Sequence, residues 1–173
     1  MSKEEKKVNR RDFLFTASYT IGAVGVGAVV WPLVHQMNPD KAQQALATTE
    51  VDISQVEPGN SITVLWRGKP VFLKRRTPEE ITEARAVSLT ELPDPQKDEE
   101  RVKEGKDEWL VMLGVCTHLG CVPLKDKGDY NGWFCPCHGS HYDGSGRIRK
   151  GPAPKNMEIP KFEFVNNNTI KIG

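Results

Sequence analysis

The longest apolar segment of the chain lies near its N-terminus, where no charged residue occurs over positions 13–34. A helix needs about 20 apolar residues to cross a bilayer, so this segment is long enough. Glycine is unfavourable inside soluble helices but common in membrane spans, and Gly22, Gly25 and Gly27 lie within the run. No other segment is apolar enough to surround it as a core helix. We therefore predict a transmembrane anchor helix over 13–34.

Beyond residue 50 the pattern changes to short runs in which apolar and polar residues alternate, as is typical of β-strands. A continuous apolar run at 109–113 predicts a buried strand, and residues 67–70 and 166–168 predict turns. Many short strands joined by turns indicate an all-β fold, an antiparallel β-sandwich over 50–173. The alternating runs are 51–53, 62–66, 71–73, 157–159, 162–165 and 169–172.

One stretch of this domain, 77–106, has a different pattern. Thr77 followed by Pro78 and two glutamates is typical of a helix start. Residues 94–106 are dense in charge and are predicted to be solvated. We interpret the stretch as a helix and loop insertion on the sheet, without evident chemistry.

The residues that flank the apolar run predict how it is inserted. Basic residues precede it within 1–12, whereas positions 39–41 are nearly neutral, which favours a cytoplasmic N-terminus and a domain on the outer side. The sequence Asn9-Arg10-Arg11-Asp12-Phe13-Leu14 resembles a twin-arginine export signal. A small-x-small cleavage motif at 45–47 lies well beyond the run. We therefore expect an uncleaved anchor followed by a flexible tether over 35–49.

Composition changes this picture mainly through cysteine and histidine. The net charge is only +1 and no basic cluster is interleaved with aromatic residues, which argues against nucleic-acid binding. All four cysteines lie between positions 116 and 137, and histidines 118, 138 and 141 share that region. Such clustering predicts either disulfides or a metal site.

Two segments carry the candidate chemistry: Cys-Thr-His-Leu-Gly-Cys at 116–121 and Cys-Pro-Cys-His-Gly-Ser-His-Tyr-Asp at 135–143. Each places a histidine shortly after a cysteine, so two loops can supply one thiolate and one imidazole each. A structural zinc also accepts two cysteines and two histidines, but its motifs usually pair cysteine with cysteine. That site would leave two cysteines unexplained, and two disulfides would leave the histidine spacing unexplained.

These two segments resemble the Rieske iron–sulfur family, in which two cysteines bind one iron and two histidines the other. The resemblance implies a [2Fe–2S] cluster within the loops of 114–154. Its ligands would be Cys116, His118, Cys135 and His138.

Further residues match the pattern of the family's high-potential branch. Cys121 and Cys137 match a disulfide that joins the loops, and Ser140 and Tyr142 match hydroxyls that hydrogen-bond to sulfur. Leu119 and Gly120 match the exposed docking tip, whereas His141 and His35 are predicted to be structural or surface residues. A proline loop that covers the cluster is matched by Gly151, Pro152, Ala153 and Pro154.

With the anchor included, the chain resembles the Rieske subunits of quinol–cytochrome c reductases. This resemblance implies electron transfer from quinol to a c-type cytochrome haem, with His138 and His118 at the quinol contact. It also implies cytochrome b as a partner, a multi-subunit dimeric complex, and a single-pass inner-membrane location with a periplasmic domain. The alternatives are a small Rieske subunit of another exported oxidoreductase, such as arsenite oxidase, and a tethered zinc-binding structural domain.

Overall fold

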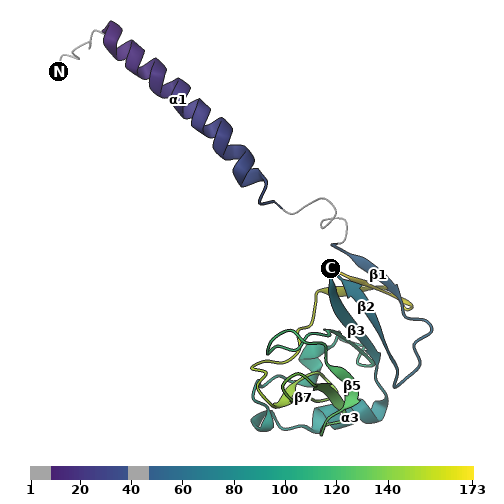
Figure 1. Cartoon of the computed structure of the whole chain (residues 1–173). Helices are drawn as coiled ribbons and strands as arrows, with labels where there is room; N and C mark the ends of the chain where they lie inside the picture. Colours follow the sequence, from purple (N-terminus) through teal and green to yellow (C-terminus); the bar gives the residue numbers. More distant parts are fainter. Residues whose placement is uncertain (1–8, 39–46) are drawn as a thin grey trace, which may run out of the picture. The chain divides into compact units, whose positions relative to one another are not determined.

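The computed structural model describes residues 9–38 and 47–173, and the chain divides into two units, Met1–Gln44 and Ala45–Gly173 (Figure 1). The first unit contains α1, Arg10–His35, which buries none of its side chains. Among the described residues, α1 is the one helix long and apolar enough to cross a membrane. It includes all of the predicted span, and the paired arginines Arg10 and Arg11 open its first turn.

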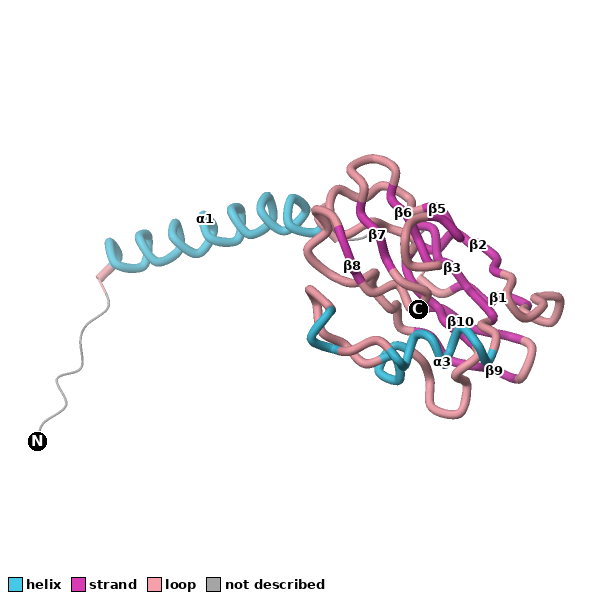
Figure 2. The backbone as a smooth tube through the Cα atoms, turned by 90° about the horizontal axis from the view of Figure 1, so that it is seen from below, coloured by secondary structure: helices cyan, strands magenta, loops and turns pink. Residues whose placement is uncertain are grey.

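The second unit contains three antiparallel sheets, which confirms the all-β prediction. The strands are β1 (Thr49–Asp52), β2 (Ser61–Trp66), β3 (Lys69–Arg75), β4 (Trp109–Leu113), β5 (Leu124–Lys127), β6 (Gly132–Cys135), β7 (Ser140–Tyr142), β8 (Ile148–Lys150), β9 (Phe162–Asn166) and β10 (Thr169–Ile172). The first sheet has the order β1-β10-β9, the second β2-β3-β4, and the third β5-β6-β7-β8. Helix α3 (Pro78–Ala86), which is labelled in Figure 2, and the short helices η1 (Leu89–Glu91) and η2 (Asp98–Arg101) lie in the connection between β3 and β4.

Strands β3 and β4 are buried on both faces and separate two hydrophobic cores. Val71 and Leu73 face the core shared with the β1-β10-β9 sheet. Phe72 and Met112, which alternate with them in the paired strands, face the core beneath the predicted metal loops. A strand with two buried faces has no polar positions in its middle, which explains the continuous apolar run in β4.

The helix start predicted at Thr77 is confirmed by a reciprocal cap. The Thr77 backbone N–H donates to Glu80 Oε2 at 2.9 Å, and the Glu80 N–H donates to Thr77 Oγ1 at 3.3 Å. This capping box satisfies two N–H groups that the first turn of α3 would otherwise leave unpaired.

Two predictions about the second unit are wrong. Residues 157–159 form no strand, because their backbone hydrogen bonds go to two different segments. The Met157 N–H donates to the Gly146 carbonyl, whereas the Glu158 carbonyl accepts from the Leu113 N–H. The charge-dense stretch 94–106 is not simply solvated, because Asp98 and Arg101 of η2 are 1% and 2% exposed. Both are paired within the fold, as described below.

The tether predicted over 35–49 ends earlier than the sequence indicated. The Ala47 carbonyl accepts a hydrogen bond from Trp66 Nε1 at 2.8 Å, and Thr49 pairs with Ile172 in the β1-β10 ladder. These residues therefore belong to the folded second unit. At the other end, His35 closes α1, and positions 39–46 lie outside the described residues.

A stack of two aromatic rings joins the second sheet to the third. The rings of Phe72 in β3 and Trp133 in β6 are nearly parallel, with centroids 4.4 Å apart. A Cβ atom at Gly114 would lie 2.5 Å from the Phe72 ring, so this position requires glycine. The ring thus fills the space directly below the segment that leads to Cys116.

We predict that Phe72→Ala destabilises the second unit by about 3–5 kcal/mol, because it removes the ring contact and leaves a cavity. Urea unfolding followed by circular dichroism measures the change. The matched control is Leu65→Ala, which truncates a side chain that is 71% exposed and should change the unfolding free energy by less than about 0.5 kcal/mol. Equal losses in the two variants would contradict this role of Phe72.

Candidate metal centre

The two predicted metal-binding loops contain the same hydrogen-bonded turn. In the first, the Gly120 N–H donates to the Cys116 carbonyl at 2.9 Å, and in the second the Gly139 N–H donates to the Cys135 carbonyl at 3.0 Å. Both glycines have a positive φ, 83° and 74°, a left-handed conformation that side chains disfavour. Each loop thus begins with a cysteine and closes on a glycine, with a histidine between them.

Strands fix the base of each loop. Cys135 ends β6 and pairs with Ser140 at the start of β7, so the second loop is the connection of a hairpin. Cys116 follows β4 closely, after Gly114 has bonded to the Pro70 carbonyl at 2.8 Å. Cys135 therefore lies at the end of a strand and Cys116 lies three residues beyond one, and both are 2% exposed.

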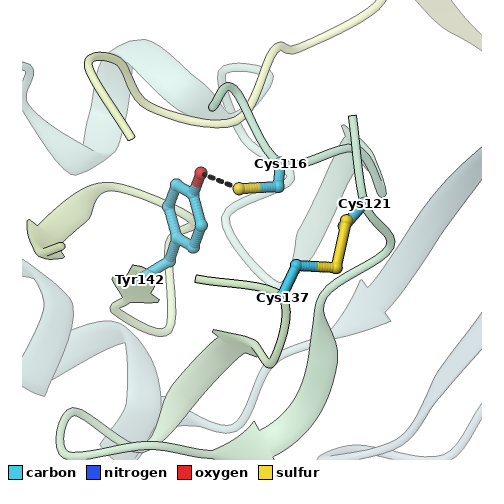
Figure 3. Close-up of a disulfide and its surroundings, with 4 residues drawn as sticks. All are labelled: Cys116, Cys121, Cys137 and Tyr142. Carbon is cyan, nitrogen blue, oxygen red and sulfur yellow. Dashed lines mark hydrogen bonds between the residues drawn. A yellow bond between two sulfur atoms is a disulfide. The ribbon is translucent and has the colours of Figure 1, made fainter. Parts of the chain in front are cut away.

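The four cysteines have two different states. Cys121 and Cys137 form a disulfide that joins the two loops, as predicted (Figure 3). Cys116 and Cys135 are free and buried. The sulfurs of Cys121, Cys135 and Cys137 lie within 4.8 Å of one another, but a disulfide cannot supply thiolate ligands. The pair that remains available is Cys116 and Cys135, and the two-disulfide alternative is wrong.

The histidines that follow these two cysteines lie against each other. The rings of His118 and His138 meet edge to face, with centroids 4.7 Å apart. The Nδ1 atom of His118 is buried and has no hydrogen-bond partner among the described residues. Because buried polar atoms are nearly always paired, this nitrogen fits a metal ligand.

His141 is turned to a different partner. Its Nδ1 accepts a hydrogen bond from the Asp129 backbone N–H at 3.1 Å, and its ring makes edge-to-face contacts with the rings of Phe134 and Tyr130. The structural role predicted for His141 agrees with these contacts.

Two hydroxyl groups that the family resemblance implies for the site lie at the base of the loops. Tyr142 O–H donates to Cys116 Sγ at 3.3 Å (Figure 3), and its oxygen accepts from the Thr117 N–H at 3.2 Å. Ser140 is fully buried, and its Oγ accepts from the Ala153 N–H at 3.2 Å. Thr117 was not among the predicted site residues, because its backbone contact leaves no mark in a sequence pattern.

The predicted proline loop lies against the second cysteine loop. A Cβ atom at Gly151 would lie 2.5 Å from the Gly139 carbonyl oxygen, and Gly151 has a φ of 106°. Ala153 is buried, whereas Pro152 and Pro154 are exposed. Only glycine at position 151 allows the loop to approach this closely.

The tip of the first loop is exposed and apolar. Leu119 is 71% exposed and Gly120 is also exposed, as expected of a docking tip. Val122 and Leu124, which are 50% and 49% exposed, are further exposed apolar residues nearby in the chain that the sequence analysis did not identify.

Comparisons with known proteins agree with this geometry. Residues 47–163 match the model of the "Rieske [2Fe-2S] domain". The chain belongs to the Rieske [2Fe–2S] family. Residues 1–40 match the model "Ubiquitinol-cytochrome C reductase Fe-S subunit TAT signal", which confirms the predicted twin-arginine signal.

Relatives extend the match to nearly the whole chain. The ubiquinol-cytochrome c reductase iron-sulfur subunit of Rhodospirillum rubrum is 56% identical over 170 residues, with 95% of this chain and 92% of the relative covered. That of Rickettsia felis is 52% identical, with 98% and 96% covered. A solved structure titled "Hyperthermophilic respiratory Complex III" is 30% identical with a TM-score of 0.53, covering 90% of this chain and 97% of its own.

Family membership decides between the alternatives left open by the sequence. This Rieske chain is an iron–sulfur electron-transfer subunit of the ubiquinol–cytochrome c reductase type, and its cofactor is a [2Fe–2S] cluster. The tethered zinc domain is therefore wrong. The free thiols of Cys116 and Cys135 and the unpaired His118 nitrogen fit such a cluster.

The surroundings shift the acidity of the groups at the base of the Rieske loops. Burial raises the pKa of Cys135. Burial also acts to raise the pKa of Cys116, but hydrogen bonds from Tyr142 and the His118 backbone outweigh it, so this pKa is lowered. Burial and the bond to Cys116 raise the pKa of Tyr142 to about 12. The phenol therefore keeps its proton and remains a donor to sulfur at any physiological pH.

We predict that stability depends on Tyr142 at alkaline pH. An unfolded tyrosine ionises near pH 10, whereas folded Tyr142 does so only at about 12. The stabilisation from this raised pKa is fully present below pH 10 and is lost as the pH rises to about 12. In Tyr142→Phe, urea unfolding should show a weaker decline across that window. Tyr130→Phe, which removes a different hydroxyl, is the control, and identical declines in both variants would contradict the assignment.

Proposed function

We propose that Cys116 and Cys135 hold one iron of the cluster and that His118 and His138 hold the other. The observation that carries this assignment is the separation of the cysteines into a disulfide pair and a free pair. It leaves one thiol and one imidazole on each loop. The buried, unpaired Nδ1 of His118 supports imidazole ligation from the first loop.

When bound, the cluster supplies a one-electron carrier whose reduction is easier than that of an all-thiolate cluster, because two neutral imidazoles replace two anionic thiolates. Hydrogen bonds to sulfur favour the more negative state further. Tyr142 donates to Cys116 Sγ, and we assign Ser140 to the same task.

The proposed substrate is a quinol. His138 is exposed and His118 is half-buried, so His138 is the residue that we assign to the quinol hydroxyl. The ring nitrogen of His138 that does not bind iron would accept the hydrogen bond and take the proton. Leu119 and Gly120 would contact the apolar surroundings of the quinol on cytochrome b, and a c-type cytochrome would receive the electron. We propose a dimeric complex for this assembly.

The proposed location is an energy-transducing membrane, with the N-terminus in the cytoplasm and the second unit in the periplasm. The basic residues before α1 and the twin-arginine signal support this orientation. The disulfide between Cys121 and Cys137 also supports it, because disulfides persist in oxidising compartments.

Replacing each histidine singly tests the ligand assignment. We expect His118→Ala and His138→Ala to lose the bound iron and the visible absorbance of the purified full chain, because each removes an imidazole ligand. His141→Ala is the matched control and should retain both, because its ring bonds to Asp129 instead. Iron analysis and optical spectra measure the outcome. Retention of iron by both ligand variants, or its loss from the control, would overturn the assignment.

Replacing the paired arginines tests the orientation. We expect Arg10→Lys combined with Arg11→Lys to leave the second unit in the cytoplasm, because twin-arginine export depends on the arginine pair. Protease added to spheroplasts should then degrade the second unit of the wild-type chain but spare that of the variant. Lys6→Arg combined with Lys7→Arg is the charge-conserving control. Protection of the wild-type second unit from added protease would contradict the proposed orientation.

A further inference from the structure

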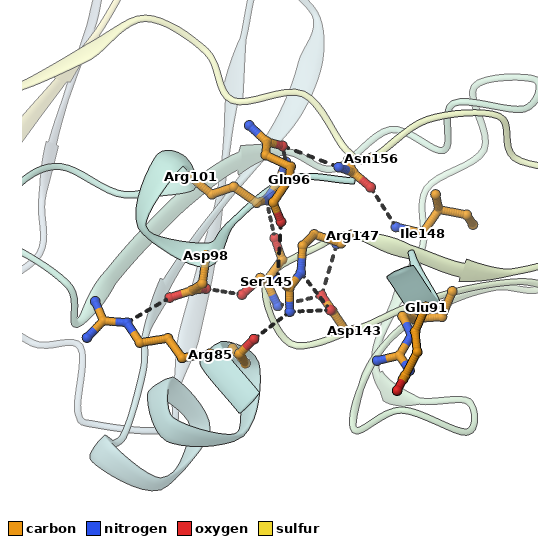
Figure 4. A network of polar contacts seen from close by, with 12 residues as sticks. Arg85, Glu91, Gln96, Asp98, Arg101, Asp143, Ser145, Arg147, Ile148 and Asn156 are labelled. Carbon is orange, nitrogen blue, oxygen red and sulfur yellow. Dashed lines mark hydrogen bonds and ion pairs between the residues drawn. The ribbon is translucent and has the colours of Figure 1, made fainter. Parts of the chain in front are cut away.

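A buried polar network links the part of the insertion that follows α3 to the segment that follows the proline loop (Figure 4). Its charged centre pairs Arg76 with Asp98 at 2.6 Å, and Ser145 also bonds to Asp98. The Tyr142–Cys116 contact is not part of this centre. Asn156 connects the network to the cluster side, because it lies two residues after the proline loop.

Asn156 uses all of its side-chain hydrogen-bonding groups and its backbone N–H. Its backbone N–H donates to Asp94 Oδ2 at 2.9 Å, and its Nδ2 donates to the Asp94 carbonyl at 3.0 Å and to Gln96 Oε1 at 3.3 Å. Its Oδ1 accepts from the Ile148 N–H at 2.9 Å. The residue is 7% exposed, so water does not replace these partners easily.

The partners of Asn156 are themselves held in place. Gln96 Oε1 also accepts from Arg101 Nη1 at 2.6 Å. The remaining Arg101 nitrogens donate to the Ser145 carbonyl and the Met157 carbonyl, each at 2.7 Å. Arg101 is 2% exposed, and its contacts fix the insertion relative to residues on both sides of the proline loop.

The segment just before Asn156 makes two contacts with the cluster-binding loops. The Lys155 carbonyl accepts from Thr117 Oγ1 at 2.6 Å, and the Ala153 N–H donates to Ser140 Oγ at 3.2 Å. Because Ser140 Oγ accepts this bond and is fully buried, its own hydrogen must be donated to another acceptor. The position of Ala153 therefore determines the direction in which the Ser140 hydroxyl donates.

We propose that Asn156 is a positioning residue for the reduction potential. Its bonds to Asp94 and Gln96 fix the proline loop, so that the Ala153 N–H aligns the Ser140 hydroxyl for donation to sulfur of the cluster. This inference rests on the proposed function, in which Ser140 is such a donor. The insertion thereby acquires a role that its charge-dense sequence does not indicate.

The test is a redox titration of the full chain carrying Asn156→Ala, with low-temperature electron paramagnetic resonance to follow the reduced cluster. We expect a lower midpoint potential than wild type and shifted resonance positions, at unchanged iron content. Asn167→Ala, at an exposed position in the β9–β10 turn, is the matched control and should leave both unchanged.

A double-mutant cycle shows whether Asn156 acts through Ser140. Ser140→Ala alone should lower the potential, and adding Asn156→Ala should then lower it by less than in the wild-type background. An unchanged potential in iron-loaded Asn156→Ala, even with a lower melting temperature, would overturn the proposal. So would an equal shift in both backgrounds. An unchanged potential in Ser140→Ala alone would instead contradict the role of Ser140 in the proposed function.

A milder variant is measured if Asn156→Ala retains no iron. The side chain of Asp94, on the insertion, is half-buried, and its carboxylate accepts the hydrogen bond from the Asn156 backbone N–H. Asp94→Ala removes this acceptor. It should lower the potential in the same direction but by less, because the bonds to the Asp94 carbonyl and Gln96 remain. A wild-type potential in iron-loaded Asp94→Ala would then overturn the proposal.

Discussion

The structure depends on holding two short loops face to face while leaving one thiol and one imidazole free on each. The disulfide between Cys121 and Cys137 joins the loops, and the matching turns at Gly120 and Gly139 give them the same shape. Together the disulfide and the two turns fix the positions of the loops relative to each other. Side chains held in place in this way reduce the entropy that cluster binding would otherwise cost.

The rest of the second unit supports this arrangement from three directions. From below, the stack of Phe72 on Trp133 joins the loops to the strands with two buried faces. At the base, Tyr142 donates a hydrogen bond to the free thiol of Cys116. From the remaining side the proline loop contacts Ser140, and the network around Asn156 fixes that loop. Burial, hydrogen bonding and covalent linkage therefore all act on the same few residues.

Local sequence patterns predicted those parts of the protein that depend on near neighbours. The anchor helix, the Thr77 cap and the strands β1–β4, β9 and β10 were readable from periodicity and capping. The strands β5–β8 were not predicted, because each is only three or four residues long. The spacing of cysteine and histidine limited the chemistry to a few choices. Resemblance to a family supplied the disulfide pairing, which spacing alone left open. Contacts between distant residues were not readable. Asp98 was predicted to be solvated because its partners, Arg76 and Ser145, are remote in the sequence. Ala47 was assigned to the tether because no neighbouring residue indicates that its carbonyl accepts a hydrogen bond from the distant Trp66.

The central claim is that both sulfur and imidazole nitrogen bind the same two-iron centre. Pulsed electron paramagnetic resonance of the reduced full chain, produced in cells supplied with nitrogen-15 histidine, tests this ligation most directly. The account predicts magnetic coupling of the cluster to nitrogens of two histidines, and its loss for one of them when His138 is replaced by cysteine. A reduced cluster with no coupling to histidine nitrogen would contradict it.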